Sequence, residues 1–116
     1  MKAIEEAIAY PGPSIIIAYS HCGEHGYDLK EGAVQQSKAV DSGYWPLFRF
    51  DPSKPKGKKF KLDSKEPSMP LSEFMYNETR FTRVVKENAK LGAKLLKQAQ
   101  EEVNSNWERL ELYRKM

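Results

Sequence analysis

The chain of 116 residues has one cysteine, two histidines and no long apolar run. A single cysteine cannot form an intramolecular disulfide, so a reducing, cytoplasmic compartment is expected. No signal-peptide pattern is present, and no run approaches the roughly 18 apolar residues that a membrane helix requires, so a membrane partner is not expected. The formal net charge of +3 is too small to indicate binding to nucleic acid.

Proline is absent after Pro70, and glycine nearly so, whereas residues 1–69 are rich in both. This length is sufficient for one domain with a buried core. The composition therefore predicts a single domain over residues 1–116, with a strand and helix part at residues 1–69 and a helical part at residues 70–116.

Residues 14–19 form an unbroken apolar run, Ser-Ile-Ile-Ile-Ala-Tyr, after a short helical pattern at residues 1–9 and a Pro-Gly-Pro turn. Such a run is typical of a strand buried on both faces, as in a parallel sheet. The predicted fold class is therefore α/β, with a partial and mainly parallel sheet, an edge hairpin and C-terminal helices. Apolar flanks of such a partial sheet favour self-association of the isolated chain.

The remaining elements follow from local patterns. Residues 30–42 fit a helix that ends at Gly43, and residues 44–51 and 60–63 fit the two strands of the hairpin. From Arg83 onward, apolar residues at three- and four-residue spacing predict one long helix. The predicted hairpin turn and the strand after it are rich in lysine: Lys54, Lys56, Lys58, Lys59 and Lys61. These positive charges could bind an acidic partner. We prefer the interpretation that they keep an exposed loop soluble and its strand edge unpaired.

The predicted strand leads into a loop that holds His21, Cys22 and His25. An iron-sulfur cluster needs about four thiolates and this chain supplies one. Zinc bound by these three residues would need a further ligand from elsewhere, and a Cys–His nucleophile would need an orienting residue and an oxyanion hole. From the residues alone, an inert cysteine is favoured and the other interpretations stay open.

Several segments, in the same order, resemble one enzyme family. They are GPSIIIAYSHC at residues 12–22, HG at 25–26, QQ at 35–36, AVDSGYWPLFRFDP at 39–52, LDSKEP at 62–67 and FMYNETRF at 74–81. Together they are similar to the C-terminal part of the thiamine-diphosphate-binding domain of pyruvate:ferredoxin (or flavodoxin) oxidoreductase. The resemblance covers essentially the whole chain.

The resemblance implies an enzyme that cleaves pyruvate with coenzyme A to acetyl-CoA and carbon dioxide. The implied cofactors are thiamine diphosphate, Mg²⁺ and [4Fe–4S] clusters, which pass electrons to ferredoxin or flavodoxin. The implied partners are the remaining domains of the parent polypeptide and that electron acceptor.

In the family, a cysteine after the last strand of this domain supplies one ligand to the cluster nearest the thiamine cofactor, and the position that matches is Cys22. Gly23-Glu24 departs from the family, whose members usually carry an apolar residue just after the cysteine. The charge of Glu24 would lower the cluster potential, unless its side chain simply points to solvent. The chain has no Gly-Asp-Gly motif and no other cysteine, so it is expected to be a fragment that is inactive and without a cluster on its own. The alternatives are a stand-alone binding or scaffold module descended from that domain, and an unrelated metal or thiol protein that uses Cys22, His21 and His25.

Overall fold

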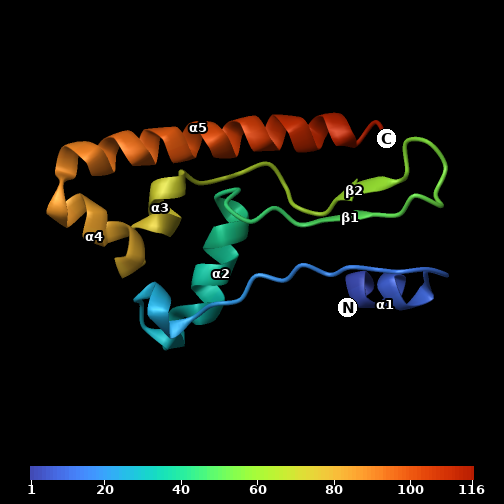
Figure 1. The fold of residues 1–116 in the computed structure, drawn as a ribbon, viewed down its shortest axis with the longest axis horizontal. Coiled ribbons are helices and arrows are strands. Elements are labelled where there is room, and N and C mark those ends of the chain that lie inside the picture. Colours follow the sequence, from blue (N-terminus) through green and yellow to red (C-terminus); the bar gives the residue numbers. More distant parts are fainter.

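A computed structural model describes all of residues 1–116 (Figure 1). The molecule is elongated, with extents of 50 × 29 × 22 Å. It is mostly helical and has one two-stranded hairpin. No helix combines the length and the apolar character that crossing a bilayer requires. The elements in chain order are α1 (Lys2–Ala9), the 3₁₀ turns η1 (Gly23–His25) and η2 (Leu29–Glu31), α2 (Gly32–Asp41), β1 (Phe48–Phe50), β2 (Phe60–Leu62), α3 (Leu71–Met75), α4 (Thr79–Glu87) and α5 (Ala89–Tyr113).

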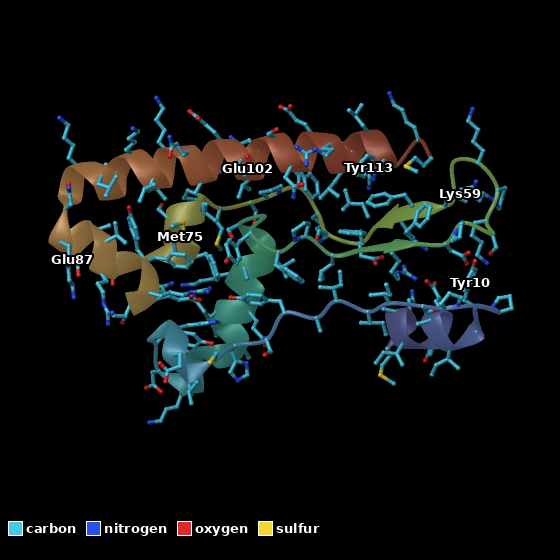
Figure 2. All side chains as sticks on the ribbon, in the orientation of Figure 1. Tyr10, Lys59, Met75, Glu87, Glu102 and Tyr113 are labelled. Carbon is cyan, nitrogen blue, oxygen red and sulfur yellow. The ribbon has the colours of Figure 1, made fainter.

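Helix α5 runs along the molecule and joins two separate cores (Figure 1). Near its middle, Leu71 and Phe74 of α3 are buried with Ala39 of α2, beside partly buried Val103 of α5. Near its C-terminal end, Leu110 packs on the hairpin residues Phe60 and Leu62. Tyr113 lies over the hairpin as well (Figure 2), with its ring 5.6 Å from that of Phe60. The structure thus has two small cores rather than one.

The helix end at Gly43 and the hairpin confirm two predictions from local sequence. Gly43 follows α2 with φ of 80°, and a Cβ atom there would lie 2.8 Å from Pro67 Cγ. Only glycine adopts this left-handed conformation readily and leaves the space that the proline ring fills. In the hairpin, Phe48 pairs with Leu62 and Phe50 with Phe60 in antiparallel register.

The prediction of one long helix from Arg83 is wrong at Asn88. The backbone there is extended, and the Asn88 side chain accepts a hydrogen bond of 3.0 Å from Leu91 N, so Asn88 caps the start of α5. Helices α4 and α5 pack closely beyond this break, since a Cβ atom at Gly92 would lie 2.9 Å from the backbone of Val85.

The predicted parallel sheet is absent from this chain. Residues 14–19 are extended but form no strand, and Ile15, Ile16 and Ile17 are 88%, 53% and 77% exposed. A strand needs a neighbour that pairs with its backbone, and no backbone group of residues 13–21 is bonded to another backbone group. The only sheet is the antiparallel hairpin, which residues 14–19 do not join.

Candidate functional site

Cys22 is exposed at the start of a tightly turned loop. The amide of His25 donates a hydrogen bond of 3.1 Å to the Cys22 carbonyl, and the amide of Gly26 donates one of 3.1 Å to the Gly23 carbonyl. These two bonds form the η1 turn directly after the cysteine. The thiol is therefore open to solvent while the backbone beside it is ordered by local hydrogen bonds.

Gly26 fastens this loop to the start of α4. Its carbonyl accepts hydrogen bonds from Thr79 N at 3.0 Å and from Thr79 Oγ1 at 2.7 Å. Gly26 has φ of 79°, and a Cβ atom on it would lie 2.4 Å from the Cβ atom of Thr79. A side chain at this position would therefore meet both backbone strain and a steric clash.

A fully buried carboxylate, that of Glu78, lies beneath the loop. Its Oε2 accepts a hydrogen bond of 2.8 Å from Gln35 Nε2, and its Oε1 accepts one of 2.5 Å from Arg80 Nε. Gln35 Nε2 also donates to the carbonyl of Phe74 at 2.9 Å. Burial of a charge is costly unless the charge is paired and hydrogen-bonded, and these partners meet that condition.

Two rings connect Glu78 and Arg80 to the loop. Arg80 Nη2 donates a hydrogen bond of 3.1 Å to the hydroxyl of Tyr19, whose ring stacks on that of His25 at 6.2 Å between centroids. His25 Nδ1 lies 3.9 Å from Glu78 Oε1, beyond hydrogen-bond distance, and is buried without a hydrogen-bond partner. His25 thus faces inward to the Glu78 carboxylate.

The surroundings shift the pKa values of this group in consistent directions. Burial, followed by the negative charge of Glu78, raises the pKa of Tyr19 and the pKa of Tyr27. Both phenols therefore stay neutral at neutral pH. Burial alone would lower the pKa of Arg80, but the hydrogen bond to Glu78 and the charge of that carboxylate outweigh it, and the pKa of Arg80 is raised. The site accordingly contains a stable carboxylate–guanidinium pair.

The structure separates the three residues that the sequence grouped. His21 lies against Gly32 at the start of α2, where a glycine Cβ atom would lie 3.1 Å from its ring, whereas His25 is turned toward Glu78. No group of three or more histidine, cysteine or acidic side chains lies close enough to hold a metal ion. Glu24 is exposed, and the lysine-rich loop lies at the hairpin, at the other end of the molecule from α4 (Figures 1 and 2).

Sequence reasoning missed the roles of Gln35, Glu78 and Arg80. The spacing of these residues carries no signal, because Gln35 is 43 residues from Glu78. The one sequence signal for these three residues is that all of them fall within the segments that resemble the oxidoreductase family.

The residues fit a [4Fe–4S] cluster at one corner only. Such a cluster needs about four thiolate ligands. Cys22 offers one exposed Sγ atom on an ordered loop, and no second cysteine exists in the chain. The chain therefore suits the supply of a single ligand, with the other ligands provided by different residues.

Comparison with known proteins identifies the class to which this segment is related. No protein-family model matches the chain. The chain is nevertheless homologous to a segment of about 110 residues in the pyruvate:ferredoxin and pyruvate-flavodoxin oxidoreductases.

The relatives include the pyruvate-flavodoxin oxidoreductase of Rhodospirillum rubrum, which is 48% identical over 108 residues, or 92% of this chain and 9% of that protein. The pyruvate-flavodoxin oxidoreductase of Trichormus variabilis is 47% identical over 110 residues, or 93% of this chain and 9% of that protein. The pyruvate:ferredoxin oxidoreductase of Moorella thermoacetica is 38% identical over 118 residues, which are 100% of this chain and 10% of that protein. The chain thus spans about a tenth of the length of these curated relatives.

Proposed function

We propose that this chain is the C-terminal segment of the thiamine-diphosphate-binding domain of a cytoplasmic pyruvate:ferredoxin or pyruvate-flavodoxin oxidoreductase. The single observation that carries the proposal is the 48% identity to such an enzyme over 92% of the chain. The reaction converts pyruvate and coenzyme A to acetyl-CoA, carbon dioxide, one proton and two electrons. Ferredoxin or flavodoxin accepts the electrons.

Within this enzyme, Cys22 is proposed to be one ligand of a [4Fe–4S] cluster. When bound, such a cluster accepts and passes on single electrons. The contribution of this chain is the thiolate of Cys22 and the loop that orients it. The exposure of the thiol and the hydrogen bond from His25 N to the Cys22 carbonyl support this role. Thiamine diphosphate, Mg²⁺, the coenzyme A site and the other cluster ligands are proposed to lie in parts of the parent enzyme outside this segment.

The exposed isoleucines support a second part of the proposal, which concerns the fold in the parent enzyme. Residues 14–18 have an extended backbone without hydrogen-bond partners and include three exposed isoleucines. Unpaired apolar strands of this kind readily add to another sheet. In the full-length enzyme this run is proposed to become a central strand of a mainly parallel sheet. Residues 1–69 and 70–116 would then be two parts of one domain, which upstream residues complete.

In the isolated chain the same surface is available to a second copy. Self-association is therefore proposed, and light scattering over a concentration series measures it directly. A scattering mass that stays monomeric at all concentrations would contradict this part.

The role of Cys22 is tested by Cys22→Ser in a full-length pyruvate oxidoreductase that carries this segment. We expect loss of the iron of one cluster and of its electron paramagnetic resonance (EPR) signal after anaerobic purification. His21→Ala, on the exposed neighbour, is the matched control and should keep all the iron. Full iron content and unchanged signals in Cys22→Ser would contradict the ligand role. The isolated chain, purified in the same way, is expected to hold no stoichiometric iron.

A further inference from the structure

The most unusual feature outside the proposed ligand is the buried charge of Glu78. This carboxylate is held by two organised partners, although buried ion pairs can often be replaced by apolar residues without loss of stability. Its hydrogen bonds to Gln35 and Arg80 are 2.8 and 2.5 Å long. Stability alone therefore does not account for the arrangement, and its position beneath the Cys22 loop calls for a reason.

Glu78 and the two residues after it hold the loop on both sides of the cysteine. Before Cys22, Tyr19 receives a hydrogen bond from Arg80, the guanidinium that Glu78 orients. After Cys22, Gly26 receives two hydrogen bonds from Thr79, the residue next to Glu78. Cys22 lies three residues after the first anchor and four residues before the second.

His25 closes the same arrangement from inside the loop. Its amide donates to the Cys22 carbonyl, and its ring fills the space between Tyr19 and the Glu78 carboxylate. A change in the position of Glu78 would thus reach the Cys22 backbone through His25 as well as through Arg80 and Tyr19. Ligand residues hold a fixed geometry only when residues behind them are themselves held by packing and hydrogen bonds.

We propose that Glu78 is a positioning residue for Cys22, which fixes through Arg80, Tyr19 and His25 the direction in which the thiolate meets its cluster. This inference rests on the proposed function, because it assumes that Cys22 binds iron. It goes beyond that function in assigning the support of the ligand to a buried carboxylate in α4's N-terminal cap.

The first test measures the loop itself by amide hydrogen exchange in the 116-residue chain. Glu78→Gln keeps the shape of the side chain but removes its charge and places an NH2 group against the donor of either Gln35 or Arg80. We expect exchange at the His25 and Gly26 amides to become about tenfold faster, while exchange in α5 is unchanged. Glu87→Gln makes the same substitution at the exposed C-terminal end of the same helix (Figure 2) and should change neither. Equal loss of protection in the loop and in α5 would show a merely structural role and overturn the proposal.

The second test is spectroscopic and uses a full-length pyruvate oxidoreductase that carries this segment. In Glu78→Gln we expect full iron content but a changed EPR line shape and a shifted midpoint potential for the cluster that Cys22→Ser abolishes. Unchanged line shape and potential would overturn the inference. If Glu78→Gln does not fold, Arg80→Lys replaces it, since lysine keeps the charge beside Glu78 but cannot also reach Tyr19. The same spectroscopic changes are then expected.

The two proposals fail in different ways. If Cys22→Ser keeps all its iron, the proposed ligand role is wrong whatever the Glu78 variant does. If Cys22→Ser loses one cluster while Glu78→Gln and Arg80→Lys leave the remaining spectra unchanged, the ligand role stands and only the positioning role is wrong.

Discussion

The Cys22 loop and the isoleucine run before it are adjacent in sequence but differ in almost every structural respect. The loop is anchored at Tyr19 and Gly26 by hydrogen bonds from Arg80 and Thr79. In the run before it, the backbone groups of residues 14–18 have no hydrogen-bond partner, and the three isoleucines are exposed. The polar segment therefore finds its partners within this chain, and the apolar segment does not.

This difference indicates where the loop and the isoleucine run each find the residues that stabilise them. The loop is ordered by residues 53 and 61 positions away in the sequence, so its geometry is a property of this segment. Residues 14–18 are exposed here, and their strongly apolar character makes sense only against a surface that other residues provide. The segment accordingly carries a loop whose hydrogen-bond partners lie within the chain, beside an extended run whose partners do not.

The largest loss of unfolding free energy is expected in the core, and a matched substitution in the isoleucine run should cause a much smaller loss. Leu71 is 1% exposed, so Leu71→Ala should lower the free energy of unfolding by about 2–5 kcal/mol. Ile16→Ala removes a similar amount of apolar surface from a residue that is 53% exposed, and the loss should stay within about 0.5 kcal/mol. Urea unfolding followed by circular dichroism measures both. Similar losses at the two positions would mean that the run is packed in solution.

A smaller effect should appear at the loop anchor. Gly26→Ala places a side chain in a left-handed conformation and against Thr79, and we expect a loss of roughly 3 kcal/mol. Gly57 is the matched control, because its φ is 84° but no atom lies within 4 Å of a Cβ there. Gly57→Ala should cost only the backbone term of about 1–2 kcal/mol. If the two variants unfold at the same urea concentration, the contact with Thr79 does not restrain the loop.

The smallest effect concerns the attachment of α1, the helix that precedes the run. Arg49 binds both Glu6 of α1 and Asp63, and it contacts the latter through two hydrogen bonds of 2.7 Å. The bond from Arg49 is the main cause that lowers the pKa of Asp63. Because the folded pKa lies below the unfolded value of about 3.9, the stabilisation is complete above that pH and is lost as pH falls through the folded pKa.

The bond between Arg49 and Asp63 is tested by Asp63→Asn, with urea unfolding measured between pH 2.5 and 7. Since the carboxylate is one-third exposed, solvent screening limits the expected loss at pH 7 to about 0.5–1 kcal/mol. The variant should also show a weaker dependence of stability on pH below about 4. An unchanged acid profile would mean that Asp63 does not contribute to it.

Local sequence was sufficient for the elements whose causes are local. The proline and glycine pattern placed the end of α1, Gly43 placed the end of α2, and alternation with prolines placed the hairpin. It was not sufficient at Asn88, because an asparagine within an apolar helical pattern can either continue the helix or cap the start of a new one. Nor could it place Gln35 beside Glu78, since no periodicity connects residues so far apart.

By itself, then, the sequence determined the first two α-helices, the hairpin, the position of the one thiol and the relationship to the pyruvate oxidoreductases. Only the tertiary structure decided that His25 faces a buried carboxylate, and that the three isoleucines stay exposed. The physical reason is the same in both cases. A buried charge and a β-strand are each stable only with partners, and partners are chosen by packing in three dimensions rather than by neighbours in the chain.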